Sequence, residues 1–288
     1  MVLELEGWKV FVHPALLGGG AGGSGGRQTA KKAAVAAEDE AEERKEEEEE
    51  GVQEDGEADE GRLPSLAELG AEAVRVLQWQ LYLAARTVGE PQLAALRRVP
   101  IWLELPGAPS ACAGAEYHWG PEWLVAHGRN PDKARSIEFT DARSLVHWGA
   151  SHLPTMVLHE LAHAYHDHVL GEHHAPIEAA YEEAVASGRY AAVLRISGGP
   201  DEEHYGCTNK FEYFACASAA YFGQSDYFPF VNAEMARHDP RCHALMAEIW
   251  GAPRRGASFE RGEERERRAK RTLVSLVQGS PPWPSSRG

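Results

Sequence analysis

Alternating apolar and polar residues near the N-terminus predict short β-strands. Residues 7–13 read Gly-Trp-Lys-Val-Phe-Val-His and are followed by Pro14, a pattern typical of a strand that ends at a turn. Residues 99–105 and 136–140 contain further apolar, β-branched and aromatic residues between turn signals, so they predict a second and a third strand. The first half of the chain is therefore expected to contribute a small sheet.

Helical spacing of apolar residues dominates the remaining segments. The longest run follows Ser65 and Glu68, which have the spacing of a capping box, and continues to Ala84. Further helices are predicted at residues 91–98, 141–149, 153–169, 175–187, 190–196, 209–222, 230–238 and 240–250. Because the strands come early and helices follow, we predict an α+β fold with a small N-terminal sheet and a mainly helical C-terminal part.

Two segments have compositions that do not favour a packed core. Residues 18–62 pass from a glycine tract through alanine and lysine into an acidic run, which predicts a disordered insertion that could also dock a basic partner. Residues 253–288 are rich in Arg, Glu and Pro and predict a charged tail. Residues 1–17 and 63–252 would then form a single domain.

The net charge of −15 comes almost entirely from the insertion. Residues 38–60 contain 15 acidic residues against two basic ones, so the rest of the chain is close to neutral. No basic stripe lies in the body of the chain, and we therefore expect no nucleic-acid partner.

The cysteines and the apolar runs restrict the class of protein further. Four cysteines lie far apart without a CxxC pair, which favours reduced thiols over a disulfide framework or a thiolate zinc site. They are Cys112, Cys207, Cys216 and Cys242. No signal peptide is recognisable, and no apolar run approaches the roughly 18 residues of a spanning helix. We expect a cytoplasmic protein without a membrane partner.

The helical segment 153–169 contains His159-Glu160-Leu-Ala-His163. Side chains at positions i and i+4 lie on the same face of a helix, so the two imidazoles can bind one metal ion together. A zinc ion held in this way acidifies a water molecule, and Glu160 can accept its proton as a general base. The motif therefore predicts a zinc-dependent hydrolase.

A zinc site needs a third ligand, and the spacing leaves two interpretations of the best candidate. The longer motif with a third histidine fails, because position 166 is His instead of Gly and position 169 is Val. Glu212 lies in the first turn of the helix predicted at residues 209–222. It can be the third ligand, or it can complete a capping box with Asn209 as the N-cap.

The motif and the blocks that follow it resemble a known class of zinc enzymes. His159-Glu-Leu-Ala-His163, followed by Tyr205, Asn209, Glu212 and Tyr213-Phe-Ala, resembles the zincin metallopeptidases of the anthrax lethal factor type. Residues 159–167, 205–215 and 221–230 are similar to blocks of uncharacterised zinc-peptidase-like proteins with HELAHAYHD and EYFA motifs. The resemblance implies a zincin-like domain, one Zn²⁺ with Glu212 as third ligand, and hydrolysis of a peptide or protein substrate.

The same resemblance implies a role for Tyr205 and for the residue at position 216. Tyr205, seven residues before Glu212, would donate a hydrogen bond to the oxyanion of the tetrahedral intermediate. Related enzymes commonly carry an acid four residues after the glutamate ligand, and it orients a ligand histidine; this chain has Cys216 there. A thiol accepts hydrogen bonds poorly, so we expect reduced metal affinity or activity unless Asp167, one turn after His163, takes that role.

Other interpretations remain at this point. His166, His168, His173 and His174 crowd the end of the motif helix and could form a second metal site, although histidines in such positions are more often structural. The chain could also be a catalytically weakened zinc-binding interaction protein. A third interpretation, a metal-dependent hydrolase of a non-peptide amide or ester, would use the same site residues.

Overall fold

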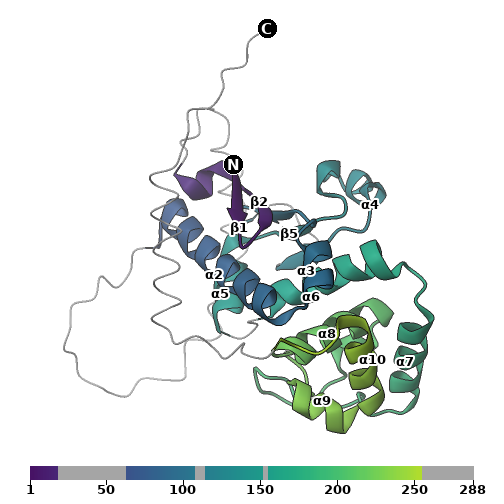
Figure 1. The fold of residues 1–288 in the computed structure, drawn as a ribbon. Coiled ribbons are helices and arrows are strands. Elements are labelled where there is room, and N and C mark those ends of the chain that lie inside the picture. The colour runs from purple at the N-terminus through teal and green to yellow at the C-terminus, as the bar shows by residue number, and fades with distance from the viewer. Residues whose placement is uncertain (19–62, 108–113, 152–154, 255–288) are drawn as a thin grey trace, which may run out of the picture.

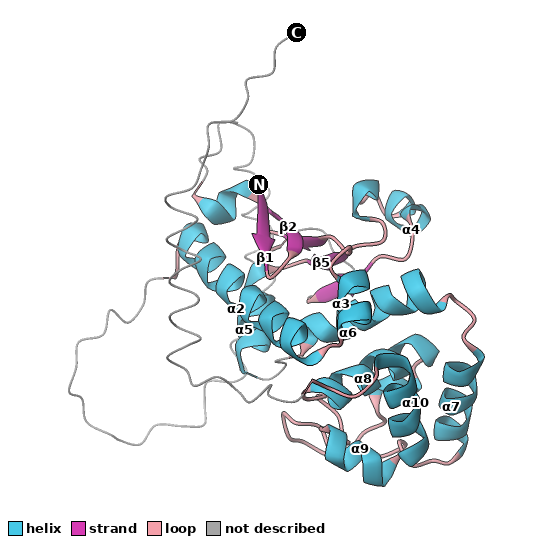
Figure 2. Cartoon of the chain, viewed as in Figure 1, coloured by secondary structure: helices cyan, strands magenta, loops and turns pink. Residues whose placement is uncertain are grey.

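The structure is a computed structural model that describes residues 1–18, 63–107, 114–151 and 155–254 (Figure 1). Nearly all of the predicted insertion at 18–62 and of the predicted tail at 253–288 lies outside the described residues. The described part has an N-terminal five-stranded mixed sheet and a mainly helical C-terminal part (Figure 2). The predicted α+β fold class is therefore confirmed.

The sheet has the order β1-β2-β3-β5-β4. Its strands are β1 (Val2–Leu5), β2 (Trp8–Val12), β3 (Ile101–Leu103), β4 (Ala115–Tyr117) and β5 (Ile137–Phe139). The three central strands β2, β3 and β5 are parallel and match the three predicted strands. The outer strands β1 and β4, which the sequence did not predict, pair antiparallel at the two edges.

The described residues contain nine labelled α-helices. They are α2 (Leu66–Thr87), α3 (Glu90–Leu96), α4 (Pro121–Ala126), α5 (Ala142–Ser151), α6 (Met156–Tyr165), α7 (Ala175–Ala186), α8 (Lys210–Phe222), α9 (Asn232–His238) and α10 (Pro240–Trp250). The capping box predicted for the long helix is present, because Ser65 Oγ accepts the Glu68 N–H and Glu68 Oε2 accepts the Ser65 N–H. The α4 helix was not predicted.

Two predicted features of the helical part are wrong. Residues 190–196 do not form a helix; they make isolated β-bridges, Val193 with Glu202 and Arg195 with Tyr227. Pairing with distant segments outweighs the weak helical pattern of so short a stretch. The motif helix also changes to a π-helical turn, η3 (His166–Leu170), after α6. This wider turn shifts the helical phase, so Val169, expected to be buried, is 48% exposed.

Helix α6 lies between the sheet and the helical part of the molecule (Figure 1). It contacts β4 and α2 on one side and α8 on the other. A continuous hydrophobic cluster extends from Leu5 to Trp250 and includes Val157, Leu161 and Phe214 around α6. The predicted metal-binding motif is therefore carried by an element that the core holds from two sides.

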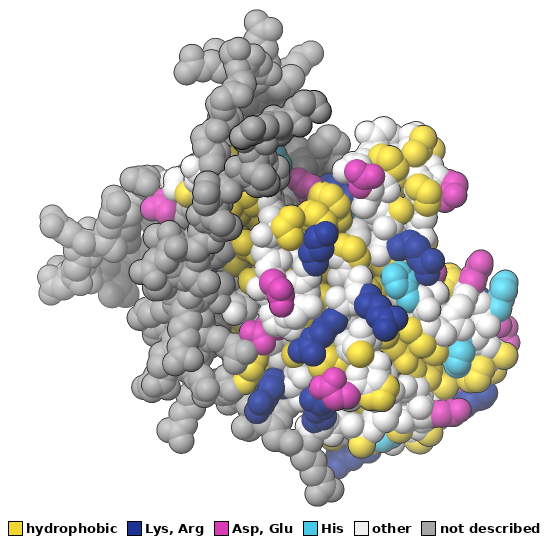
Figure 3. Space-filling model, turned by 45° about the horizontal axis from the view of Figure 1, so that its top comes forward, with side chains coloured by type: hydrophobic (Ala, Val, Ile, Leu, Met, Phe, Trp, Pro, Cys, Tyr) yellow, Lys and Arg dark blue, Asp and Glu magenta, His cyan; other side chains and the backbone are white. Residues whose placement is uncertain are grey.

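Charged side chains of both signs are mixed on the surface of the described part (Figure 3). Lys and Arg side chains are scattered among acidic and apolar ones across the described part of the face in Figure 3. Within the described ranges, every helix is too short or too polar to cross a bilayer.

Candidate metal centre

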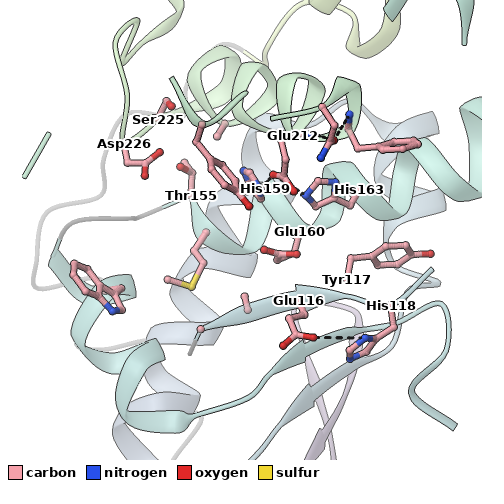
Figure 4. A pocket seen from close by; sticks show the side chains of 18 of the residues that line it. Glu116, Tyr117, His118, Thr155, His159, Glu160, His163, Glu212, Ser225 and Asp226 are labelled. Carbon is pink, nitrogen blue, oxygen red and sulfur yellow. Dashed lines mark hydrogen bonds and ion pairs between the residues drawn. The ribbon is translucent and has the colours of Figure 1, made fainter. Parts of the chain in front are cut away.

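Helix α6 is positioned at its N-terminus by a buried glutamine. Gln80 on α2 donates its Nε2–H to the Gly149 carbonyl at 2.9 Å and accepts the Val157 N–H at 2.9 Å. The first N–H groups of a helix lack partners within the helix, so this bond fixes where α6 begins. His159 and His163 then lie one turn apart on the face that looks toward α8 (Figure 4).

Helix α8 brings Glu212 to the two histidines. The Asn209 side chain caps α8 by accepting the N–H groups of Phe211 and Glu212 at 2.9 and 3.0 Å. The Glu212 carboxylate faces away from this cap, and its Oε2 lies 3.1 Å from His159 Nε2 and 3.4 Å from His163 Nε2. Its position thus matches the ligand interpretation and not the capping-box interpretation.

The three candidate ligand atoms form a nearly equilateral triangle. The Nε2 atoms of the two histidines lie 3.2 Å apart. Glu212 Oε2 lies 3.1 Å from one of them and 3.4 Å from the other. Ligand atoms about 2.1 Å from a tetrahedral zinc ion lie about 3.4 Å from one another, so the triangle has the size that zinc requires. In the described residues, this is the one group of three or more His, Cys, Asp or Glu side chains that could hold a metal ion.

The protonation of Glu212 also suits a ligand. Burial opposes ionisation, but the neighbouring imidazoles of His159 and His163 outweigh it and lower the pKa of Glu212. The carboxylate is therefore anionic, and two imidazoles with one carboxylate form a donor set that zinc binds in hydrolases.

Glu160 lies beside the triad and faces the sheet. Its side chain is buried, with 7% of the residue exposed, yet it lines the cavity onto which the triad opens. Figure 4 shows its carboxylate between the triad and Glu116 of β4. Burial raises the pKa of Glu160, although the two histidines oppose the shift. A carboxylate with a raised pKa is a better proton acceptor than an exposed one.

The cavity has a volume of about 810 Å³ and is lined from three sides. Strand β4 forms one wall, α6 and the start of α8 form the second, and residues 195–197 with 224–226 form the third. Tyr205, on the 3₁₀ turn η4 (Tyr205–Cys207), is 47% exposed and lines this cavity. Its neighbour His204 is buried outside the lining, where its Nδ1 accepts the Gly206 N–H at 2.8 Å and shapes the turn.

Cys216 occupies the place that the resemblance assigns to a supporting acid. Its Sγ lies 4.0 Å from His159 Nδ1, at the limit of a sulfur hydrogen bond. Asp167 does not take over that role. It accepts the Tyr117 hydroxyl at 2.6 Å and pairs with Arg135 at 3.2 Å, whereas His163 Nδ1 is buried without a hydrogen-bond partner in the described structure. The π-helical turn begins at His166, and Asp167 within it points toward β4.

The other histidines of this region do not gather around a second metal position. His166 is fully buried among the rings of Trp119, Phe211 and Phe214, and burial lowers its pKa to about 4. His173 is exposed and lies 3.3 Å from Glu178. These histidines do not appear in any group of three candidate ligands among the residues described.

A buried ion-pair network supports β4 from the side of the sheet. Glu138 of β5, only 2% exposed, lies 2.7 Å from His118 Nε2, 2.7 Å from Lys133 Nζ and 2.5 Å from Arg129 Nη2. Arg129 also binds Glu116 at 2.8 Å. Burial opposes ionisation of Glu138, but its cationic and hydrogen-bonding partners outweigh it and lower its pKa to about 2. The network therefore fixes the β4 side chains that line the cavity.

We expect Glu138→Gln to destabilise the fold by about 3 kcal/mol, because removal of one buried partner leaves Lys133 and Arg129 without their shared charge. The folded-state pKa lies below the ordinary value of 4.5. The stabilisation is therefore complete above pH 4.5 and is lost as the pH falls toward 2. Thermal unfolding across this pH range should show a dependence in the wild type that the variant lacks. Glu178→Gln, at a more exposed ion pair with Lys210, is the control and should change the unfolding temperature much less; an equal loss in both variants would contradict the role of burial.

Some cavity residues were not predicted from the sequence. Glu116 belongs to β4, a strand of three residues that is too short to give an alternating pattern, and His118 directly follows this strand. Asp226 lies on the third wall, with residues 224 and 225, and its only sequence signal is its place in the block 221–230. Trp119 and Trp148 are exposed on the cavity wall. The sequence pattern gave no indication that these two tryptophans line a cavity.

The comparisons with known proteins leave the site to be interpreted from its geometry. No family model, no curated protein and no solved structure matches this chain.

Proposed function

We propose that the chain is a zinc-dependent peptidase in which His159, His163 and Glu212 hold the metal. The observation that carries this proposal is the triangle of three ligand atoms that opens onto a cavity also lined by Glu160. Structural zinc sites usually close the fourth position with a protein ligand, whereas catalytic sites leave it for water or substrate. In the described residues the group has three members, which favours a catalytic site.

The wall formed by β4 favours a peptide as the substrate. β4 is the last strand of the sheet and contributes Ala115, Glu116 and Tyr117 to the cavity lining. An extended peptide can add to such an edge through main-chain hydrogen bonds, which do not depend on its side chains. This arrangement would lay a peptide bond alongside Glu160 and the triad. A small amide or ester would not need a strand edge.

The reaction follows from the positions of the chain's own groups. Bound zinc would polarise the scissile carbonyl and lower the pKa of a water molecule toward 7. Glu160 accepts a proton from the attacking water as the carbon–oxygen bond forms. Tyr205 donates a hydrogen bond to the negative oxygen of the tetrahedral intermediate. The carbon–nitrogen bond then breaks, and Glu160 returns the proton to the leaving amine, which balances the reaction.

A second candidate function is that of a zinc-binding protein with weakened catalysis. The contact between Cys216 Sγ and His159 Nδ1 at 4.0 Å favours it, as does the buried His163 Nδ1 without a hydrogen-bond partner in the described structure. Ligand histidines usually donate their outer N–H to a carboxylate, a carbonyl or water, and loss of such support costs roughly 10–100-fold in affinity or activity.

Profiling against a peptide library tests the proposed activity. We expect the zinc-loaded full chain to cleave internally quenched peptides, to lose cleavage on treatment with a chelator, and to recover it when zinc is restored, because the metal supplies both the polarised carbonyl and the activated water. The measurement is the initial rate together with identification of the fragments by mass. Zinc binding without cleavage of peptides would favour the second candidate, and cleavage of ester or amide probes alone would favour a non-peptide hydrolase.

A further inference from the structure

The acidic residues of the cavity differ in whether another residue already engages them. Glu212 faces His159 and His163, and Glu116 is bound by Arg129 at 2.8 Å. Glu160 has the position of the general base. The remaining acid, Asp226, lies on the loop between α8 and α9 and lines the cavity; its carboxylate accepts a hydrogen bond from its own backbone N–H, and no ion pair or side-chain hydrogen bond engages it in the described residues. Among the described residues, it therefore has no cationic side chain of its own as a partner.

The described cavity lining contains one arginine or lysine, and it is paired with another acid. Arg195 lies 3.5 Å from Glu202 and stacks over the Tyr227 ring, 5.4 Å from its centroid. Burial raises the pKa of Asp226, and a backbone hydrogen bond together with the charges of His159 and Arg195 only partly opposes this shift. An ionised carboxylate in such a place gains from a cation that enters the cavity.

The backbone around Asp226 is held in place before any ligand binds. The Asp226 carbonyl accepts the Ile196 N–H at 2.8 Å, and Ser225 donates its N–H to the Phe230 carbonyl at 2.8 Å. Thr155, at the start of α6, donates its hydroxyl to the Gln224 carbonyl. Figure 4 shows Asp226, Ser225 and Thr155 together on the side of His159 that lies away from His163. The backbone that carries the carboxylate is thus fixed relative to the metal ligands.

Apolar side chains line the same cavity as Asp226 and the triad. Met156 precedes His159 by less than one turn of α6, and Trp148 is an exposed residue of α5; both belong to the cavity lining. A lysine or arginine side chain combines an apolar stem with a charged end, so it suits a cavity that is lined by both apolar side chains and a carboxylate. A free α-amino group would offer the same charge without the stem.

We propose that Asp226 binds a cationic group of the substrate, an ammonium or guanidinium, on the His159 side of the scissile bond. This inference rests on the proposed function and specifies its substrate class: peptides with a basic side chain, or a free N-terminus, near the cleaved bond. Asp226 is a specificity-determining residue in this arrangement, whereas Glu160 and the triad carry out the chemistry.

Matched peptides test the preference and identify its source. The two fluorogenic peptides of each pair would differ at one position near the cleaved bond, where one has lysine and the other norleucine. Each peptide would be made with a free and with an acetylated N-terminus. We expect a lysine at one position, or the free amine, to raise kcat/KM by about 10-fold or more by lowering KM. This is the size of effect expected from one hydrogen bond to a charged group. Asp226→Asn keeps the shape of the side chain and should remove this advantage, and Asp226→Lys should favour a glutamate peptide instead.

Asp201→Asn is the control, because Asp201 is an exposed acid outside the cavity lining and its loss changes the net charge equally. It should keep the wild-type preference. The unfolding temperature of each variant separates a binding effect from misfolding. An unchanged preference in Asp226→Asn, or no preference for either cation in the wild type, would overturn the inference.

Binding to a catalytically inactive chain distinguishes failure of this inference from failure of the proposed function. Fluorescence anisotropy of labelled lysine and norleucine peptides would be measured with Glu160→Gln and with the double variant that also carries Asp226→Asn. Tighter binding of the lysine peptide that disappears in the double variant supports the inference even if the wild type cleaves no peptide. Equal binding of the two peptides contradicts it even if the wild type cleaves both.

Discussion

Replacement of Glu160 by glutamine should reduce peptide hydrolysis by roughly 1,000-fold while zinc remains bound. Glutamine has nearly the same shape but cannot accept a proton, and general-base catalysis contributes about 10²- to 10⁴-fold in enzymes. Glu160 also lies outside the triangle of candidate ligand atoms formed by His159, His163 and Glu212. The measurement is therefore a pair: the rate on a peptide identified by the library, and the zinc content by elemental analysis.

Glu172→Gln provides the matched control, since Glu172 is exposed just beyond the end of η3 and lies outside the cavity lining. It should keep both the rate and the metal. Wild-type hydrolysis by Glu160→Gln would show that the proposed mechanism is wrong. Loss of zinc together with activity would instead assign Glu160 to holding the metal site. An unchanged unfolding temperature in the variant is needed before either outcome is interpreted.

The parts of the fold that could be predicted are those whose signal is local. The capping box at Ser65 and the apolar spacing after it predicted α2, because both arise within a few residues of the chain. β4 has only three residues, and its position depends on β5, which lies about twenty residues further along the chain. Residues 190–196 show the reverse error: a local helical pattern gave way to bridges with Glu202 and Tyr227.

The candidate site divides in the same way. His159, Glu160 and His163 could be predicted because the geometry of one helix places them. Glu212 lies on another helix, and spacing alone could not choose between a ligand and a cap; the fold decides by directing its carboxylate at the histidines. Asp226 and Glu138 depend on contacts between distant segments, so their environments could not be predicted from neighbouring residues.

The ligand atoms of the two histidines are well placed, but the outer nitrogens of their rings have weak hydrogen-bond support. The triangle has the dimensions of a zinc site, yet His159 has a thiol at 4.0 Å and the outer nitrogen of His163 lacks a hydrogen bond in the described residues. Metal affinity should then depend more heavily on the third ligand, because little else restrains the imidazole rings. This makes Glu212 the most informative position for metal binding.

Glu212→Ala should lower the zinc content from one equivalent to a small fraction under conditions that saturate the wild type. The affinity for zinc should fall by more than about 100-fold, because loss of a ligand costs more than loss of a residue that only supports a ligand. Thermal unfolding gives a second readout that needs no substrate. Zinc at about 100 times its dissociation constant should stabilise the wild type by about 2.7 kcal/mol, and this stabilisation should vanish in the variant. Glu203→Ala, at an exposed acid of the loop before η4, is the control and should keep both responses.

The result for Glu212→Ala bears on the proposed function as a whole. A full equivalent of zinc in both the variant and the wild type would remove Glu212 as an essential ligand, and the triangle would then reflect only ion pairing between a carboxylate and two imidazoles. Loss of zinc in the variant with retained binding in Glu160→Gln would instead separate the residue that holds the metal from the residue that moves the proton. Those two roles must be separable if α6 and α8 form a catalytic site and not a structural one, because a structural zinc site has no use for a general base.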